Sequence, residues 1–284
     1  MRLSVLDHGH HRRARLFLTL TSKVSRVASP DIVKMLLYRP EFLTRPLLDL
    51  TAPAMRGESY WTAAEREYLA MSTAEVHECP FCIVTHAELT RIAGHGEIDP
   101  DRPAGARPEL LAVQGFLQQV SRTAELDPAP VRDLPEQAVL DALRVNLVWN
   151  IVNRLANAFG YELLDGQLKT GTRALHRAGY RFPGFLLGED HGDLRASVFD
   201  QPAHTSPELR RAAAAGDGLE APWRDYAALV RDASHRITDD DVRRLTAAGR
   251  TEDEIFEVTV AAAVGAALRS FDAGRDAVSS SAGK

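Results

Sequence analysis

The chain is poor in cysteine: only two occur among its 284 residues, and both fall in the segment Cys79-Pro-Phe-Cys82. A secreted protein of this length more often spreads several cysteines as distant disulfide staples. A disulfide across C-x-x-C closes a very short loop, so it removes little entropy from the unfolded chain and adds little stability. The pair is therefore better placed for reversible redox chemistry than for holding the fold together.

Long apolar runs and an excess of positive charge are also absent. No apolar run reaches the ~18 residues of a membrane helix, and the first residues lack the order of basic, apolar and small-residue regions that is typical of a signal peptide. The formal net charge is −5, whereas a nucleic-acid-binding protein usually carries a basic patch and a high pI. We therefore expect a cytoplasmic protein that binds neither membrane nor nucleic acid.

Alternating β-branched runs are scarce, and apolar residues recur every three or four positions, as they do from Val139 to Ile151. That spacing indicates amphipathic helices. The segments T-A-A-E from Thr62 and T-E-D-E from Thr251 fit helix capping boxes, and Gly160 follows a helical run as a C-terminal cap would. The sequence therefore predicts an all-α protein.

The order of these signals divides the chain into helices, connections and two domains. A short tail precedes the first helices, 183–221 forms a connection with about one helix, and the last residues fray from about 279. The predicted domains are 15–182, which holds the cysteines, and 205–278, a helical domain that could be a degenerate second copy without them. Helices are predicted within 15–50, 63–76, 79–94, 109–125, 135–159 and 165–178. Three further helices are predicted within 222–276.

The local sequence places both thiols at the start of a helix. Proline is tolerated at the first helical position, so Pro80 predicts that Cys79 is the N-cap and Cys82 the third residue of the helix. Free backbone N–H groups and the positive end of the helix dipole would then favour the thiolate. His86 follows Cys82 by four residues and shares its helix face, where the imidazole could take the thiol proton.

Glu67 precedes Cys79 by twelve residues, on the preceding predicted helix. If the two helices form an antiparallel hairpin, its carboxylate returns toward the sulfurs and orients His86, directly or through water, which completes a nucleophile, base and orienting group. Blander interpretations stay open: Glu67 as a solvated surface carboxylate, and the cysteines as inert buried side chains or as half of a zinc site completed by His77, His86 or a carboxylate.

The pattern Glu67-x11-Cys79-x2-Cys82-x3-His86 resembles the active-site motif of the alkylhydroperoxidase D-like branch of the carboxymuconolactone decarboxylase family. The resemblance extends over about residues 40–160, since WNIVNRLANAFG is similar to the family's Asn-Arg helix. It implies an all-α homo-oligomer in which Cys82 attacks a hydroperoxide, Cys79 resolves the intermediate, and Glu67 and His86 relay protons. Phe81 departs from the pattern: the best-known members carry a further histidine there, so the relay is shorter.

The leading hypothesis is thus a thiol-dependent peroxidase. It would need no metal or organic cofactor, only a small-molecule hydroperoxide and a thiol or protein reductant. Three alternatives stay open: a disulfide reductase, a lyase of the lactone-decarboxylase type with Glu67 and His86 as acid and base, and a redox-sensing switch or scaffold protein.

Overall fold

The computed structural model describes residues 1–102, 105–122, 125–164, 166–189 and 192–282. Over these ranges the chain forms helices and no strand, which confirms the all-α prediction. None of the described helices has both the length and the apolar character needed to cross a membrane. The chain folds as two compact units, each assembled from separate stretches of sequence.

The first unit comprises Met1–Asp49, Arg154–Gly171 and Arg181–Ala266. It also takes in one end of α4 (Arg45–Arg56), α8 (Glu136–Phe159), α9 (Gln167–Ala178) and α13 (Glu252–Ala282). The elements that lie wholly within it are α1 (Val5–His8), α2 (Arg12–Ser25), α3 (Asp31–Tyr38), η1 (Pro40–Thr44), η4 (Gly184–Leu186), η5 (Ala196–Asp200), α10 (Pro207–Ala215), α11 (Trp223–Asp232), η6 (Ser234–Arg236) and α12 (Asp239–Ala247).

The N-terminal residues belong to the core of this unit, so the predicted N-terminal tail is wrong. Leu3 and Leu6 are fully buried. The backbone N–H of Arg2 donates to the carbonyl of Phe159 at 2.8 Å, and the N–H of Val5 donates to the Glu252 carboxylate at 2.8 Å. The tertiary contacts of this segment were not visible in the sequence, because its hydrogen-bond partners Phe159 and Glu252 lie more than 150 positions away.

A buried carboxylate ties the segment before α10 to α13. Glu257 accepts hydrogen bonds from the backbone N–H groups of His204, at 2.9 Å, and Thr205, at 2.7 Å, and it pairs with Arg39. Burial alone would raise the pKa of Glu257, but the hydrogen bonds from Thr205 and Arg39 outweigh it and the pKa is lowered. Glu257 is therefore an ionised structural anchor.

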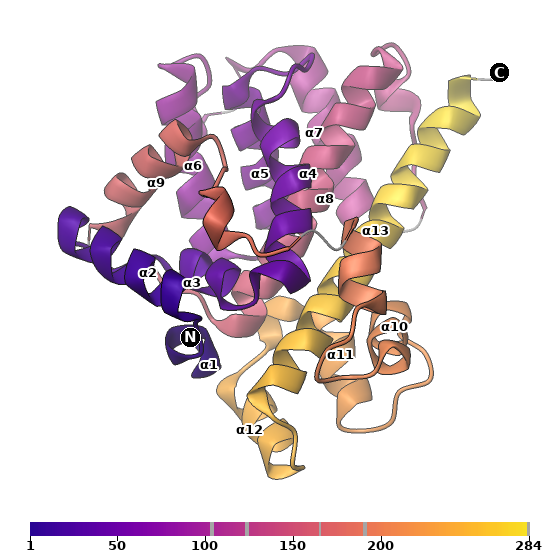
Figure 1. The fold of residues 1–284 in the computed structure, drawn as a ribbon. Coiled ribbons are helices and arrows are strands. Elements are labelled where there is room, and N and C mark those ends of the chain that lie inside the picture. The colour runs from indigo at the N-terminus through magenta and orange to yellow at the C-terminus, as the bar shows by residue number, and fades with distance from the viewer. Residues whose placement is uncertain (103–104, 123–124, 165, 190–191, 283–284) are drawn as a thin grey trace. The chain divides into compact units, whose positions relative to one another are not determined.

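The second unit comprises Leu50–Asn153, Thr172–Tyr180 and Ala267–Lys284. Its main helices are α5 (Ala63–Val76), α6 (Pro80–Gly94), α7 (Pro108–Arg122) and most of α8, with the short η3 (Ala129–Val131) beside α7. Figure 1 draws α5 and α6 side by side, and α7 also packs against α5. The three-residue link between α5 and α6 makes them the predicted hairpin.

Local signals set the boundaries of this hairpin. Thr62 Oγ1 accepts from the Glu65 N–H at 3.2 Å, while the Thr62 N–H donates to Glu65 Oε2 at 2.8 Å, so the capping box forms and α5 begins at Ala63 as predicted. Pro80 opens α6, and Gly160, with φ +66°, follows the end of α8.

Of the remaining predictions, those for the helices after residue 183 are confirmed and that for the C-terminal end is wrong. The three helices expected within 222–276 are α11, α12 and α13, and α10 is the one α-helix of the predicted connection. The fraying expected from residue 279 is wrong as far as Ala282, because α13 continues to that residue. The division into 15–182 and 205–278, with a degenerate second copy, stays a prediction, since the compact units interleave along the chain.

Candidate active site

Both cysteines lie at the start of α6, as the sequence predicted. Cys79 is the N-cap residue, in an extended conformation, and Pro80 is the first helical residue. The Ile83 N–H donates to the Cys79 carbonyl at 3.0 Å, which is the bond expected of an N-cap residue. Because α6 begins at Pro80, Cys82 is its third residue. Both thiols are free, and each cysteine is only 1% exposed. The pair is therefore a buried dithiol.

The expected effect of the helix terminus on Cys82 is wrong in direction. Burial raises the pKa of the Cys82 thiol well above its usual value, and the hydrogen bond and electrostatic interaction with the neighbouring Cys79 raise it further. Desolvation of a charge in the protein interior outweighs the partial charge of a helix end. Cys82 therefore rests as a thiol and needs a base to become a nucleophile.

Glu67 lies on α5 and is the centre of a hydrogen-bonded cluster with no solvent exposure of its side chain. Its carboxylate accepts from His86 Nδ1 at 2.8 Å, from Arg56 Nη2 at 2.5 Å, and from the Tyr180 hydroxyl at 2.9 Å to each oxygen. The sequence predicted the first of these contacts as one of two possibilities, direct or through water, and the direct contact is present. The surface interpretation of Glu67 is wrong.

These donors keep the Glu67 carboxylate charged. Burial alone would raise the pKa of Glu67, but the hydrogen bond from His86, the charge that His86 carries whenever it is protonated, and the charge and hydrogen bond of Arg56 outweigh it and lower the pKa. An ionised carboxylate only accepts hydrogen bonds, so His86 Nδ1 carries a proton and donates it to Glu67. In the neutral imidazole the other ring nitrogen, Nε2, is then the proton acceptor.

The His86 ring is held in place from the opposite helix as well. Trp149 on α8 meets it edge-on, with ring centroids 3.9 Å apart, and the Trp149 indole N–H lies 3.2 Å from Met55 Sδ. His86 is one helical turn beyond Cys82, but in the described part of the chain no hydrogen bond joins the imidazole to either sulfur. The hydrogen bond to Glu67 and the contact with Trp149 therefore hold the imidazole in one tautomer and one plane.

Sequence reasoning missed Arg56, Trp149 and Tyr180. Tyr180 lies 113 positions from Glu67, so no local spacing links them. One signal is visible only in the backbone: Tyr180 has φ +63°, a left-handed conformation that a large side chain rarely adopts. Burial and then the Glu67 charge raise the pKa of Tyr180 well above its usual value, so its hydroxyl remains a donor.

Other polar residues near the hairpin have structural partners. His77 caps α5 and bonds Asn150 Oδ1 at 2.5 Å, while Asn146 Nδ2 donates to Thr73 Oγ1 at 3.1 Å and to Ser121 Oγ at 2.9 Å. These bonds tie α8 to α5 and α7. No group of three or more His, Cys, Asp or Glu residues suited to a metal ion occurs among the described residues.

Comparison with known proteins yields a likeness to solved structures but none to named sequences. No protein-family model and no curated protein matches the sequence. A solved structure, an alkylhydroperoxidase AhpD core described as an uncharacterized peroxidase-related protein from Ralstonia eutropha JMP134, aligns with a TM-score of 0.46 and 20% identity. The alignment covers 55% of this chain and 87% of that one. Function is therefore inferred from this chain's own residues.

Proposed function

We propose that the protein is a thiol-dependent peroxidase that reduces small hydroperoxides, with Cys82 as the attacking thiol and Cys79 as the resolving thiol. One observation carries the proposal: a buried dithiol at the start of α6 lies one helical turn from His86, whose Nδ1 is bonded to an ionised, buried Glu67. This is the order of nucleophile, base and orienting anion that activates a weak nucleophile.

Activation of Cys82 requires proton transfer, because its raised pKa leaves it protonated near neutral pH. His86 Nε2 takes the thiol proton, and the resulting imidazolium is stabilised by the Glu67 carboxylate. Glu67 itself keeps no proton, since His86, Arg56 and Tyr180 all donate to it. It is thus a fixed counter-ion, and the proton relay expected from the sequence is shortened to His86 alone.

The reaction then follows in two balanced steps. The Cys82 thiolate attacks the outer oxygen of R–O–O–H, the O–O bond breaks, Cys82 becomes a sulfenic acid, and the alkoxide takes a proton to leave as R–OH. The Cys79 thiol attacks the sulfenic sulfur, a disulfide forms, and the hydroxyl leaves as water. A dithiol reductant restores both thiols and is itself oxidised to a disulfide.

Burial of both cysteines bears on the substrate and the reductant. With each residue 1% exposed, a small peroxide reaches the sulfur with less rearrangement than a bulky one. We expect hydrogen peroxide and short alkyl hydroperoxides to oxidise the pair faster than a bulky aromatic hydroperoxide. A small dithiol such as dithiothreitol is, for the same reason, the reductant with which to assay it.

Steady-state peroxide consumption with dithiothreitol tests the proposal. The wild type should turn over many equivalents per chain, and Cys82→Ser should abolish turnover, while the exposed control His8→Ala should match the wild type. Cys79→Ser should still form a sulfenic acid that dimedone traps, and Cys82→Ser should not.

Two results would contradict the proposal, the first its catalytic turnover and the second its assignment of the two cysteines. Oxidation that stops after one equivalent despite excess dithiothreitol would instead assign a redox sensor. Dimedone labelling of Cys82→Ser but not of Cys79→Ser would exchange the roles of the two cysteines.

A further inference from the structure

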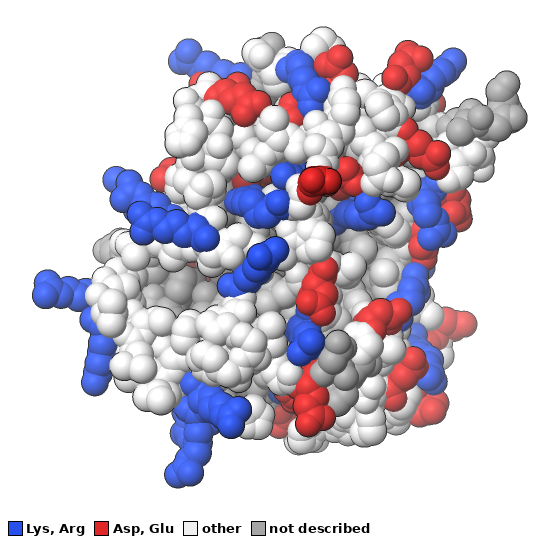
Figure 2. Space-filling model, turned by 45° about the horizontal axis from the view of Figure 1, so that its top comes forward, with Lys and Arg blue, Asp and Glu red and all other residues white. Residues whose placement is uncertain are grey.

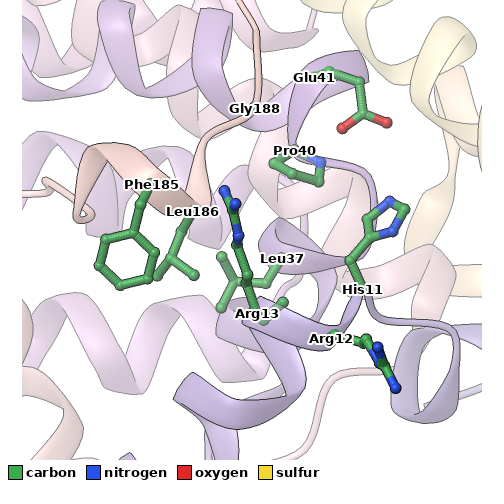
Figure 3. Close-up of a pocket in the computed structure, with 10 residues that line it drawn as sticks. His11, Arg12, Arg13, Leu37, Pro40, Glu41, Phe185, Leu186 and Gly188 are labelled. Atoms are coloured by element: carbon green, nitrogen blue, oxygen red, sulfur yellow. The ribbon is translucent and has the colours of Figure 1, made fainter.

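A cavity of about 380 Å³ opens in the first unit, apart from the residues of the thiol site. It lies between the start of α2, the end of α3 with the first residues of η1, and the turn that contains η4 (Figure 3). Its size is that of a site for a small organic molecule. The residues that line it are His11, Arg12, Arg13, Ala14, Leu37, Pro40, Glu41, Phe185, Leu186 and Gly188.

The floor of the cavity is apolar and well packed. Ala14, Leu37 and Leu186 are buried and belong to one hydrophobic cluster. The partly buried side chains that pack against this cluster are Phe17, Leu18, Val33 and Phe182. Phe185, by contrast, is 61% exposed although it lies at the cavity. An apolar floor beside an exposed aromatic side chain favours a ligand with a hydrocarbon part.

The rim is cationic. Arg12 and Arg13 are exposed and form no ion pair with any described residue, and no acidic residue occurs from Gly9 to Pro30. Figure 3 shows the Arg13 guanidinium reaching toward the turn at Gly188, whereas the Arg12 side chain extends away from it. Figure 2 likewise shows basic side chains protruding on the left of the face, the side where Figure 1 draws α2.

The placement of these charges is unfavourable unless an anion is present. The first turn of α2 contains Arg12 and Arg13 and no acidic residue, and its N-cap, His11, makes no side-chain hydrogen bond to the helix. Positive side chains at the positive end of a helix dipole repel it, whereas an anion is stabilised there. An anionic group beside Arg13 would satisfy both the guanidinium and this helix end.

One acidic residue limits where the anion can lie. Glu41 is held by its backbone, whose carbonyl accepts from Ser197 Oγ at 2.9 Å, and Figure 3 draws it on the side of the cavity away from Phe185. Gly188 lies against it, since a Cβ there would come within 3.3 Å of Glu41 Cβ. A ligand with one anionic group would place that group at Arg13 and its hydrocarbon part along Leu37, Leu186 and Phe185, whereas a second anionic group would meet Glu41.

We propose that this cavity binds a small organic carboxylate with an apolar chain. Arg13 pairs with the carboxylate, the apolar floor and Phe185 cover the chain, and Glu41 disfavours ligands with a second negative charge. The site shares no residue with the thiol site, because every residue that lines it belongs to the first unit, whereas the dithiol, His86 and Glu67 belong to the second.

Isothermal titration with three ligands of equal chain length tests the site: decanoate, decanol and decylamine. Decanoate should bind most tightly to the wild type and decylamine most weakly. Arg13→Gln should weaken decanoate binding by about tenfold, as expected for loss of a charge-assisted hydrogen bond. Glu41→Gln should tighten it, because a repelling charge is removed. Arg15→Gln, the matched control on α2 outside the cavity, should leave the affinity unchanged.

Three outcomes would overturn the proposal. The first is no saturable binding of decanoate, and the second is tightest binding of decylamine, which would make Glu41 the dominant charge. The third concerns the exposed stripe of Leu16, Leu20 and Val24 on α2. If Leu20→Gln abolishes decanoate binding while Arg13→Gln does not change it, the ligand lies on that stripe and not in the cavity.

Discussion

At the scale of single residues, Glu67 decides how the thiol site can work. A buried carboxylate with one partner could exchange a proton with it, but Glu67 accepts from His86, Arg56 and Tyr180 at once and has a lowered pKa. Its charge is therefore constant across neutral pH. In the proposed reaction, His86 is the group that changes protonation, and Glu67 sets its tautomer and stabilises the imidazolium.

The first prediction is that His86 and Glu67 act as a unit on Cys82. Single-turnover oxidation by hydrogen peroxide at neutral pH should slow by ~10²–10⁴ in His86→Ala, the usual value of general-base assistance. Glu67→Gln should also be slow, and the double variant little slower than the slower single variant. Raising the pH should partly restore His86→Ala, because hydroxide then forms the thiolate. Stopped-flow rates equal to the wild type in both single variants would rule out this role.

The second prediction concerns Tyr180, whose hydroxyl donates to the buried Glu67 carboxylate. Tyr180→Phe keeps the ring and removes one donor from a buried charge, which should lower the free energy of unfolding by ~1.5–3 kcal/mol. Tyr60→Phe is the control, because Tyr60 is half exposed and its change should stay within about 0.5 kcal/mol. Equal urea midpoints for Tyr180→Phe and the wild type would contradict the structural role of this hydroxyl.

At the scale of helices, close approach between α10 and α13 depends on one glycine. A Cβ at Gly265 would lie 2.5 Å from the Cα and 2.7 Å from the carbonyl oxygen of Ala214, both backbone atoms that cannot move aside. Gly115 in α7 has no atom within 4 Å of the same position. The two glycines therefore occupy opposite environments although both lie within long helices.

The third prediction follows from that contrast. Gly265→Ala should destabilise the protein by at least ~1–3 kcal/mol through overpacking of α10 against α13. Gly115→Ala should stabilise it by ~0.4–1 kcal/mol, because alanine lowers the entropy of the unfolded chain and fits the helix. Thermal unfolding of the two variants measures both effects. Changes of the same sign would show that the α10–α13 approach is not as close as described.

The hairpin and the position of the dithiol could be predicted from sequence because their signals are local. The capping box at Thr62 and the proline after Cys79 fix where α5 and α6 begin, and the four-residue spacing places His86 beyond Cys82. What depends on burial or on distant residues could not be predicted. The raised pKa of Cys82 comes from desolvation, and Tyr180 reaches Glu67 from 113 positions away.

At the scale of the whole chain, each unit is built around a buried, ionised glutamate: Glu257 in the first and Glu67 in the second. Both have lowered pKa values in the folded chain. The unfolded chain therefore takes up their protons first as the pH falls. Their contribution to stability is complete above the unfolded glutamate pKa of about 4.3 and is lost as the pH falls through the lower folded values.

The fourth prediction is an acid-sensitive stability with that sign. The urea midpoint should fall steadily below about pH 4.3, where the unfolded chain protonates Glu67 and Glu257 before the folded chain does. Glu67→Gln should be less stable at neutral pH and lose less on acidification, since it no longer has a carboxylate to protonate. The exposed control Asp276→Asn should follow the wild-type pH dependence. A Glu67→Gln curve parallel to the wild type would contradict the lowered pKa.

The most direct test of the central claim is a count of free thiols before and after one equivalent of hydrogen peroxide. If Cys79 and Cys82 form the proposed redox pair, both thiols of each chain should disappear, the chain mass should fall by two hydrogens, and dithiothreitol should restore both thiols. Retention of both thiols in excess peroxide, with the protein still folded, would contradict the account.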